Sequence, residues 1–326
     1  MIDTVLDRAV LPGYTNIGYR VRRSISGPPN LPAMDGKVVL VTGANSGLGL
    51  AAAEGFAQLG AGVRLLSRSE ERGRHARAEI IARTGNEDVR VCICDISELD
   101  SVRRFAAEFS QESEHLDVLV NNAGVLTAER QLSAEGLELT FATNVLGPFL
   151  LTKLLIPLLE RSAPSRIVNV SSGGMYTQRL HVEDLQSSAG RFDGATAYAR
   201  TKREGVILTE LWAQRLWNTG VVVHAMHPGW VDTPGLEASL PRFYGVTRPL
   251  LRTPREGAET IVWLGAAPEP AESSGRFWHD RRERPTHRVP WTKETLADRE
   301  RLWAECERLT DPHGVAPKTA TLDSTA

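Results

Sequence analysis

Two side chains four positions apart, Tyr198 and Lys202, have the types and the spacing needed to move a proton. On a helix, residues i and i+4 project from the same face, so the ammonium group would lie beside the phenol. A phenol has an ordinary pKa of about 10 and is a poor base at neutral pH, but a neighbouring positive charge favours the phenolate. The pair could therefore serve as general acid and base at the oxygen of an alcohol or a carbonyl group. Seen alone, the same spacing is also typical of the edge of an amphipathic helix.

A hydroxyl group that could orient such an oxygen is found at Ser172, just after a predicted strand at residues 166–170. A hydrogen-bond donor aimed at the reacting oxygen stabilises the charge that develops there during the reaction. A serine at the end of a strand also commonly forms a turn, and the adjacent Ser171 is a second candidate for the same role.

A glycine-rich segment, Thr42-Gly43-Ala44-Asn45-Ser46-Gly47-Leu48-Gly49, lies between a predicted strand at 38–41 and a predicted helix at 47–58. Glycines allow a tight turn and a close approach of backbone N–H groups to a diphosphate, which also meets the positive end of the helix. The spacing differs from the usual G-x-G-x-x-G pattern. A dinucleotide-binding turn is favoured by its position, and a purely structural turn is the alternative.

The residue that follows the second predicted strand, at 63–66, indicates which dinucleotide would bind. An acidic residue there would bind the ribose hydroxyls of NAD, whereas a basic residue accommodates the 2′-phosphate of NADP. The chain has Arg68 at this place and no acidic residue before Glu70. A guanidinium group is well suited to phosphate, so NADP is the predicted cofactor.

The elements that must position these residues alternate between strands and helices. Further apolar runs of strand length occur at 89–94, 118–120, 166–170 and 221–225, and helical segments separate them. Apolar strands that alternate with helices predict an α/β fold, a Rossmann-type doubly wound parallel sheet in a single domain. In such a sheet, ligands bind at the carboxyl ends of the strands, where all the candidate segments fall.

Several further motifs follow in a fixed order: Asn121-Asn122-Ala123-Gly124, Asn144, Ser171-Ser172, Tyr198 to Lys202, and Pro228-Gly229-Trp230-Val231-Asp232-Thr233. Together with the glycine turn, this set resembles the short-chain dehydrogenase/reductase family over about residues 36 to 280. The resemblance implies an oxidoreductase in which Tyr198 is the acid/base, Lys202 supports it, Ser172 orients the substrate, and Asn144 holds a water that links Lys202 to solvent.

The resemblance also implies contacts with the cofactor. Asp95 would accept a hydrogen bond from the adenine amino group, and Thr233 would meet the nicotinamide amide. Together with the residues argued above, the predicted cofactor-binding set is Gly43, Ser46, Gly47, Leu48, Gly49, Arg68, Asp95, Ile96, Asn122, Ala123, Gly124, Tyr198, Lys202, Pro228, Gly229, Val231 and Thr233.

One feature departs from the shortest members of the family, because Ser172 and Tyr198 are 26 positions apart. Retinol-dehydrogenase-like members carry a similar insert. We interpret residues 177–194 as a surface loop near the cleft, and the insert leaves open whether Ser171 or Ser172 points inward.

Composition excludes several other classes of protein. The 326 residues carry 38 basic and 40 acidic side chains, and a net charge of −2 gives no electrostatic reason to expect nucleic-acid binding. No apolar run reaches the roughly 18 residues of a membrane-spanning helix, and a signal-peptide core is not apparent. The odd number of cysteines, 3, argues against a disulfide framework, and the 8 histidines lack metal-ligand spacing. We therefore expect a cytoplasmic protein without a metal.

The chain is expected to have three parts. Residues 1–35 form an extension whose short helix, based on Ile2, Val5, Leu6, Ala9 and Val10, stops at Pro12-Gly13; peripheral membrane association of this helix stays open. Residues 36–280 form the dinucleotide-binding catalytic domain. Residues 281–326 form a C-terminal helix from a cap at Thr292 to about Leu309, followed by a flexible tail from Asp311, and the arginine-rich patch 281–284 is interpreted as solvated surface.

The substrate is expected to be a small carbonyl or alcohol compound of lipophilic character, because residues 234–253 mix apolar side chains with Pro and Gly in what could be a mobile lid. Two other functions are weighed against this one. A cofactor-binding scaffold or redox-responsive protein with little turnover would not need the intact Ser, Tyr, Lys and Asn. A sugar-nucleotide epimerase would need a larger C-terminal substrate domain. A homo-oligomer is an open alternative to a monomer.

Overall fold

The strands of the protein form one sheet, seen here in a computed structural model that describes residues 3, 6–7 and 9–311. In chain order they are β1 (Val38–Thr42), β2 (Gly62–Ser67), β3 (Val89–Ile93), β4 (Val118–Asn121), β5 (Ser165–Val170), β6 (Val221–Met226), β7 (Arg276–His279) and β8 (Arg282–Arg284). Their order across the sheet is β3-β2-β1-β4-β5-β6-β7-β8, and every pair is parallel except β7 with β8. The predicted doubly wound parallel sheet is confirmed.

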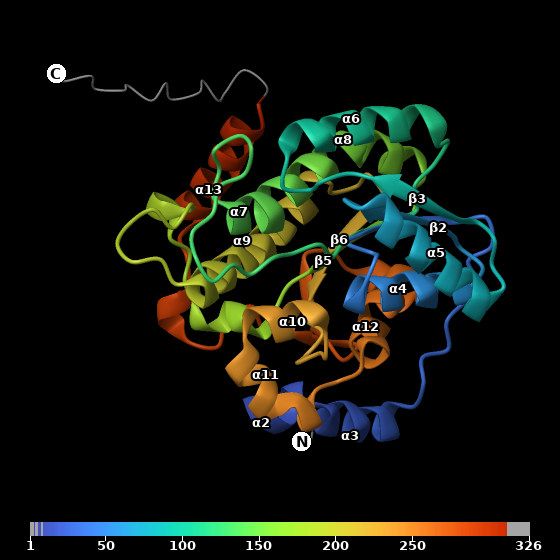
Figure 1. Cartoon of the computed structure of the whole chain (residues 1–326), viewed down its shortest axis with the longest axis horizontal. Coiled ribbons are helices and arrows are strands. Elements are labelled where there is room, and N and C mark those ends of the chain that lie inside the picture. The colour runs from blue at the N-terminus through green and yellow to red at the C-terminus, as the bar shows by residue number, and fades with distance from the viewer. Residues whose placement is uncertain (1–2, 4–5, 8, 312–326) are drawn as a thin grey trace.

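Helices cover both faces of the sheet (Figure 1). One layer contains α4 (Gly47–Gln58), α5 (Glu70–Thr84) and α12 (Pro254–Ala266), and the other contains α6 (Leu99–Glu112), α8 (Gly147–Arg161) and α9 (Gly194–Arg215). Strand β1 shows why both layers form, since its side chains alternate between two cores. Leu40 belongs to the core under α6, α8 and α9, whereas Val39 and Val41 belong to the core under α4 and α12.

The N-terminal extension contains more helix than its sequence predicts. Two of the residues on which the prediction of the first helix rests, Ile2 and Val5, lie outside the described residues. Helix α2 (Val10–Tyr14) continues through Pro12-Gly13, so the predicted stop there is wrong, and α3 (Asn16–Ser26), which the periodicity did not indicate, follows at once. Position 13 requires glycine, because a Cβ there would lie 2.1 Å from the carbonyl oxygen of Leu6.

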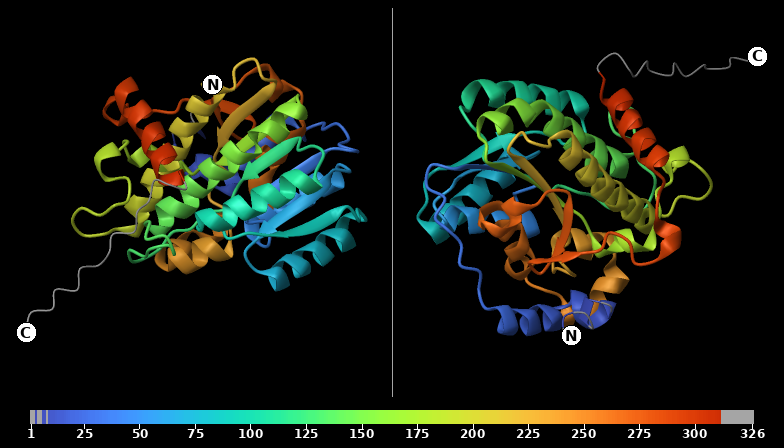
Figure 2. Two further views of the ribbon diagram at one scale, coloured as in Figure 1. Left: turned by 90° about the horizontal axis from the view of Figure 1, so that it is seen from above. Right: turned by 180° about the vertical axis from the view of Figure 1, so that it is seen from behind.

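Two short helices, α10 (Pro234–Ser239) and α11 (Pro241–Thr247), occupy the segment predicted to form a lid. A single 3-10 turn at Arg248–Leu250 then leads to α12. Views from the front and from behind both place α10 and α11 next to α2 and α3 at one end of the molecule (Figures 1 and 2). This end adjoins the carboxyl ends of the central strands, because α10 follows the loop that leaves β6.

The C-terminal part differs from the sequence prediction in three places. The hairpin β7–β8 was not predicted, and it buries Arg284 against Asp3, so the interpretation of residues 281–284 as a solvated patch is wrong for that residue. Helix α13 (Leu296–Thr310) is capped by Thr295 rather than by Thr292, through a reciprocal capping box with Asp298. The predicted tail beyond Asp311 lies outside the described residues.

One helical stretch within the described residues, from Leu139 to Arg161, is long and apolar enough to cross a membrane by length and composition alone. It consists of α7 (Leu139–Phe141), a π-helical turn (Ala142–Leu146) and α8. Because 72% of its apolar window is buried inside the domain, this stretch packs as a core helix.

Candidate active site

The candidate residues gather where β1, β4, β5 and β6 end, at one edge of the sheet. The hydroxyl group of Thr42, the last residue of β1, accepts hydrogen bonds from the backbone N–H groups of Asn122 and Ala123, both at 2.9 Å. These bonds tie the loop after β1 to the loop after β4. The carboxyl ends of parallel strands are where this type of sheet binds ligands.

The glycine-rich turn after β1 is held tightly from behind. Gly43 and Gly47 have φ values of +65° and +54°, which L side chains rarely adopt. A Cβ on Gly49 would lie 2.4 Å from the carbonyl oxygen of Gly43 and 2.5 Å from the Asn122 amide nitrogen. That amide donates to the Thr42 carbonyl oxygen at 2.8 Å. The Asn122 side chain therefore fixes the shape of the turn, and glycine at position 49 lets the two loops approach.

The open side of the turn exposes the start of α4. Ser46 is the N-cap residue, and no hydrogen bond from its side chain to the first turn of α4 is found in the described part of the chain. The first turn of α4 has no acidic residue, so its N–H groups and its positive dipole end can meet an anion. Thr233 closes the other side, since its methyl carbon would be 3.3 Å from a Cβ on Gly47. A Cβ on Gly257 of α12 would meet both Leu48 and Val231, which places these two side chains together.

The three residues predicted to contact the adenosine half of the cofactor have different surroundings. Arg68 follows β2 directly, is exposed, and has no ion-pair or hydrogen-bond partner among the described residues, so its guanidinium group can bind a ligand. One carboxylate oxygen of Asp95 accepts hydrogen bonds from the backbone and the hydroxyl group of Ser97, at 2.9 and 2.6 Å. Ile96 is buried, and its carbonyl oxygen packs against Gly147 at the start of α8.

The reacting centre is formed by Ser172 and Tyr198. Tyr198 lies in the second turn of α9, with the Ser172 hydroxyl group beside its phenol. Burial raises the pKa of Tyr198 above its ordinary value, and hydrogen bonding by Ser172 lowers it in part. The sequence predicts that the neighbouring cation lowers this pKa, but removal from water has the larger effect in the structure.

The two candidate serines point in different directions. The hydroxyl group of Ser171 donates to the carbonyl oxygen of Lys202 at 3.0 Å and is buried against α9. The hydroxyl group of Ser172 faces Tyr198 and accepts a hydrogen bond from the Gly174 N–H group at 3.2 Å. The alternative left open by the sequence is therefore decided by geometry, and it is Ser172 that adjoins Tyr198.

Lys202 lies behind Tyr198, with its nitrogen 5.5 Å from the centre of the phenol ring. It donates to the Val170 carbonyl oxygen at 2.9 Å, and burial lowers its pKa to about 8. Asn144 sits in the π-helical turn, a feature often found at functional sites. Its amide group bonds to both the N–H and the carbonyl group of Val125, at 2.8 and 3.0 Å. A Cβ on Gly124 would be 3.2 Å from Asn144 and 3.3 Å from Lys202, so glycine at this position leaves room for both side chains.

A small cavity of about 40 Å³ lies behind these side chains, lined among others by Asn121, Asn144, Asn169, Thr152 and Lys202. Asn121 on β4 donates to Asn169 on β5 at 2.8 Å and to Thr152 at 3.1 Å, yet its own amide oxygen is buried without a partner among the described residues. A cavity with this volume and polar lining suits a water molecule. No sequence pattern indicates this cavity, because it depends on how β4 and β5 pair.

The wall formed by the turn after Ser172 and the loop after β6 contains two residues that the sequence does not indicate. Tyr14 of α2 lies edge-on to His227, with ring centres 4.5 Å apart, and a Cβ on Gly173 would be 2.5 Å from its ring. Arg252 is buried between the N-terminal segment and the loop after β6, and donates to the Thr15 and Pro228 carbonyl oxygens at 3.2 and 3.1 Å. No local sequence pattern could have indicated contacts between segments more than 200 positions apart.

The candidates Pro228 and Gly229 belong to this wall. Gly229 has a φ of +83°, and a Cβ there would be 2.6 Å from both the Arg252 guanidinium group and the Tyr14 carbonyl oxygen. Protein atoms thus fill the space next to Gly229 on the side of the N-terminal segment. Pro228 and Gly229 shape the loop that carries Val231 and Thr233 toward the glycine turn.

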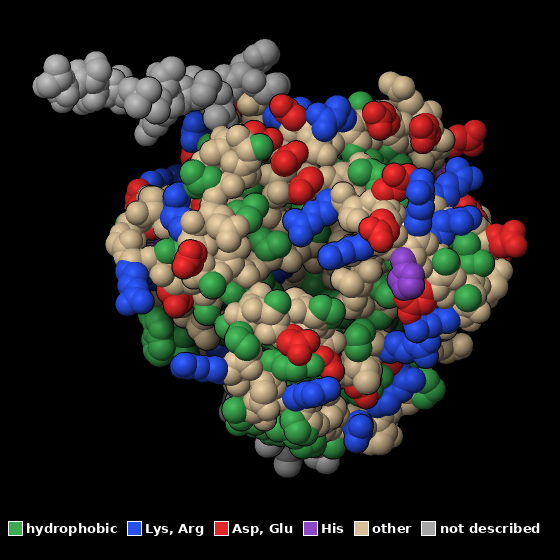
Figure 3. Space-filling view, viewed as in Figure 1, with side chains coloured by type: hydrophobic (Ala, Val, Ile, Leu, Met, Phe, Trp, Pro, Cys, Tyr) green, Lys and Arg blue, Asp and Glu red, His purple; other side chains and the backbone are tan. Residues whose placement is uncertain are grey.

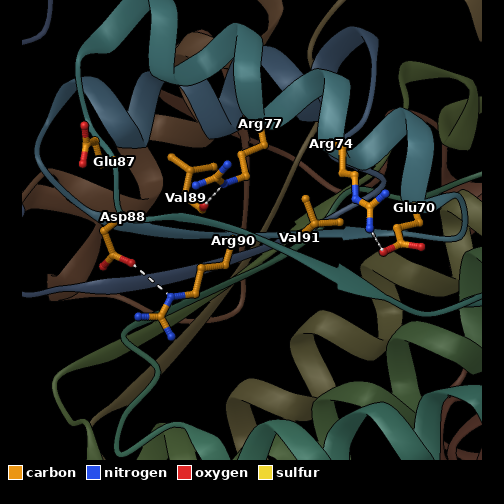
Figure 4. A pocket seen from close by; sticks show the side chains of 8 residues that line it. All are labelled: Glu70, Arg74, Arg77, Glu87, Asp88, Val89, Arg90 and Val91. Carbon is orange, nitrogen blue, oxygen red and sulfur yellow. Dashed lines mark hydrogen bonds and ion pairs between the residues drawn. The ribbon is translucent and has the colours of Figure 1, made fainter.

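A second hollow, of about 650 Å³, lies at the free edge of β3 and is shown in Figure 4. Its charged side chains largely neutralise each other: Arg74 pairs with Glu70 at 2.6 Å, and Arg90 with Asp88 at 3.5 Å. Three strands separate β3 from β5, so this hollow is not part of the site around Tyr198. Within the described residues no cluster of three or more His, Cys, Asp or Glu side chains is placed to hold a metal ion.

Comparison with known proteins adds a family and several relatives. Residues 37–242 match the family model described as short chain dehydrogenase. The chain is 42% identical to dehydrogenase/reductase SDR family member 12 of Bos taurus, over 91% of this chain and 93% of that protein. It is 37% identical to human retinol dehydrogenase 11, over 85% of this chain and 86% of that protein. A solved complex of Pseudomonas aeruginosa RhlG with NADP is 25% identical, with a TM-score of 0.63 over 75% of this chain and 94% of that chain.

Proposed function

The chain belongs to the short-chain dehydrogenase/reductase family and is an oxidoreductase of that family, and from this premise we propose that it interconverts a lipophilic carbonyl compound and its alcohol with NADP(H). The observation that carries the proposal is the placement of the Ser172 hydroxyl group beside the Tyr198 phenol, with the Lys202 nitrogen 5.5 Å from the centre of the same ring. This arrangement provides a proton donor and an orienting hydroxyl group at a single point.

The chain has a set of residues that fits a dinucleotide phosphate. The exposed start of α4 offers unpaired N–H groups to the diphosphate, and Gly49 lets the loop at Asn122 pack behind the turn that carries them. Arg68 offers a planar guanidinium group for the 2′-phosphate. A solved relative, RhlG, forms a complex with NADP, which agrees with this choice of cofactor. When bound, the reduced nicotinamide supplies the hydride that the carbonyl carbon accepts.

The remaining chemistry belongs to the protein. In the direction of reduction, the Tyr198 hydroxyl group donates its proton to the carbonyl oxygen, while the Ser172 hydroxyl group holds that oxygen in place by a hydrogen bond. The phenolate left on Tyr198 is stabilised by the Lys202 ammonium group. Asn144 fixes the loop at Val125 beside Lys202, and the polar cavity at Asn121 gives room for a water through which the proton can be replaced.

A lipophilic substrate is supported by the side chains near the open end of the site. Trp230 follows the loop after β6 and packs edge-on against Phe243 of α11, with ring centres 5.0 Å apart. The relatives include human retinol dehydrogenase 11, whose name denotes an apolar alcohol. Helices α10 and α11 would cover such a substrate, and their short length suits a segment that opens and closes.

The test follows NADPH consumption with a panel of aldehydes, ketones, steroids and retinoids, with Tyr198→Phe beside the wild type. Turnover that the variant loses, by about a thousandfold, is the expected result. Equal activity of both proteins would exclude Tyr198 as the acid. If neither protein turns over any compound although both bind NADPH, the cofactor-binding scaffold becomes the better description, and preferential turnover of small hydrophilic carbonyls would contradict the substrate class.

A reducing, cytoplasmic environment is also proposed. Cys92, Cys94 and Cys306 are free thiols, and burial raises the pKa of each. Such thiols are unreactive and need no disulfide partner. Localisation of a fluorescently tagged full chain tests this, and a signal confined to a secretory compartment would contradict it.

A further inference from the structure

Helix α3 is strongly amphipathic, but it turns its polar side toward the protein. Arg22 is buried and bonds to Asp280 of the β7–β8 hairpin at 2.6 Å and to Asp3 at 2.8 Å. The same side of α3 carries Tyr19 and Arg23. Tyr19 donates to Glu259 of α12 at 2.9 Å, and Arg23 pairs with the same carboxylate. The helix is thus fixed to the domain by ion pairs and hydrogen bonds rather than by apolar packing.

The apolar side of α3 consequently faces outward. Ile17, Val21 and Ile25 recur at every fourth position, which places them along one side of the helix. Ile17 is 48% exposed and Ile25 is 59% exposed. In most surface helices the apolar side is the buried one, so an exposed apolar side indicates a surface that another body covers.

Two neighbouring helices extend this apolar surface. Leu11 of α2 is 58% exposed and Val246 of α11 is 82% exposed. The side chain of Asn16, at the start of α3, donates to the Pro249 carbonyl oxygen at 3.2 Å, which joins α3 to the segment after α11. Hydrophobic side chains gather over this end of the molecule in Figure 3, below the position of α10. We call the outward surface of α2, α3 and α11 the end face.

The charges of the end face have a single sign. Residues 9–27 and 240–250 contain no aspartate or glutamate, and all their charged side chains are arginines. Arg22 and Arg23 are used inward, as described above. Arg20, Arg242 and Arg248 are exposed. The end face is therefore apolar at its centre and cationic around it.

We propose that the end face docks on a lipid bilayer that carries anionic headgroups. An amphipathic helix of this kind lies in the plane of the interface, with apolar side chains among the acyl chains and arginines at the phosphates. Charge argues against a second copy of this chain as the occupant, because two identical cationic surfaces would repel each other. The ion pairs of Arg22 and Arg23 hold the helix in the docking orientation before it meets the membrane.

Docking at this place would bring the bilayer close to the open end of the site. Phe243 of α11 packs on Trp230, and Trp230 lies 6.4 Å from Tyr14, ring centre to ring centre, so the end face and the wall beside Gly173 are continuous. A lipophilic substrate could then enter from the membrane. This consequence rests on the proposed function, whereas the docking itself does not.

The experiment is co-sedimentation of the full chain with vesicles of phosphatidylcholine alone or of phosphatidylcholine mixed with phosphatidylserine. We expect binding to the mixed vesicles, weaker in high salt and much weaker to phosphatidylcholine alone. Replacing both Ile17→Asp and Ile25→Asp should lower the partition coefficient at least a hundredfold, and Arg20→Glu should lower it about fivefold or more. The matched control is Leu296→Asp, since Leu296 is 81% exposed at the start of α13, outside the end face.

The vesicle experiment can contradict the proposal in two ways. The proposal is overturned if wild-type protein does not bind the mixed vesicles, or if the double variant binds as the wild type does. It is also overturned if light scattering finds a wild-type dimer that the double variant dissociates, since a second copy then covers the end face. Thermal unfolding and NADPH binding of each variant, expected to match the wild type, separate lost docking from lost folding. Loss of turnover with vesicle binding intact would affect only the proposed function.

Discussion

The Lys202 nitrogen lies 5.5 Å from the centre of the Tyr198 ring and is bonded to the Val170 carbonyl oxygen, in a place where burial lowers the lysine pKa to about 8. The cation that would stabilise a phenolate is thus itself close to losing its proton at neutral to weakly alkaline pH. Burial acts on the tyrosine in the opposite sense, because it raises the pKa of the phenol.

The pH dependence of carbonyl reduction should therefore show a falling limb near pH 8. Below that pH, Lys202 is an ammonium ion and stabilises the phenolate that Tyr198 becomes when it gives up its proton; above it, that charge is lost. We expect kcat/KM with NADPH to fall as pH rises through about 8. In Lys202→Arg the rate should be lower, but the limb should move to higher pH because guanidinium keeps its proton. A wild-type profile flat across this range would contradict the assignment.

The close packing of the glycine turn predicts the effect of a single methyl group. In Gly49→Ala the new Cβ would meet the Gly43 carbonyl oxygen at 2.4 Å, so the turn must shift. We expect NADPH to bind about tenfold more weakly or worse, as measured by fluorescence titration. Gly205→Ala is the control, because a Cβ there meets nothing within 4 Å in the middle of α9. It should leave binding unchanged and stabilise the fold by about 0.5–1 kcal/mol.

Preference between the two dinucleotides should depend on Arg68. Removal of its guanidinium group in Arg68→Ala eliminates a charged hydrogen-bond donor for the 2′-phosphate, and such bonds contribute about 1.5–3 kcal/mol. The Kd for NADPH should rise by at least about tenfold, whereas the Kd for NADH should stay the same. Arg74→Ala, a change at an exposed arginine paired with Glu70, is the control. An equal rise of both Kd values in Arg68→Ala would show that this side chain does not bind the 2′-phosphate.

The contact of Tyr14 with Gly173 predicts two different outcomes at one position. The Tyr14 hydroxyl group is buried without a partner among the described residues, so Tyr14→Phe should leave the thermal midpoint unchanged or slightly raised. Tyr14→Ala removes the ring that packs on His227 and supports the turn after Ser172, and should cost about 3 kcal/mol of stability. It should also lower kcat in protein that is still folded. A kcat unaffected in Tyr14→Ala would mean that the Ser172 turn needs no support from the N-terminal segment.

A buried carboxyl group predicts how stability changes with pH. Burial raises the pKa of Glu204 to about 8, so between about 4.5 and 8 the folded protein binds more protons than the unfolded chain. This group therefore makes the protein less stable as pH rises through that window. Glu204→Gln cannot ionise, and it should be more stable than the wild type at pH 9, on the order of 2 kcal/mol, with a smaller difference at pH 5. Thermal unfolding at both pH values, with the exposed Glu108→Gln as control, measures it; identical changes in both variants would exclude this origin.

The sheet could be predicted closely because its signals are local. Apolar runs such as Val38 to Val41 have the length of buried strands, and the predicted helix from Gly47 toward Gln58 matches α4. The placement of Tyr198 and Lys202 on one face depends only on helical spacing, which is fixed within one turn. The β7–β8 hairpin escaped prediction because its residues are largely polar and arginine-rich, and it gains its stability from distant partners such as Asp3.

By itself, the sequence determined the parallel sheet, the order of the motifs along its edge, and the spacing of Tyr198 and Lys202, because these follow from periodicity within a few residues. The tertiary structure decided that Ser172 rather than Ser171 faces the phenol, that Tyr14 supports the turn at Gly173, and that α3 turns its apolar side outward. Each of these depends on contacts between segments far apart in the chain. Such contacts are chosen by the packing of the whole domain and leave no periodic signal in the residues that make them.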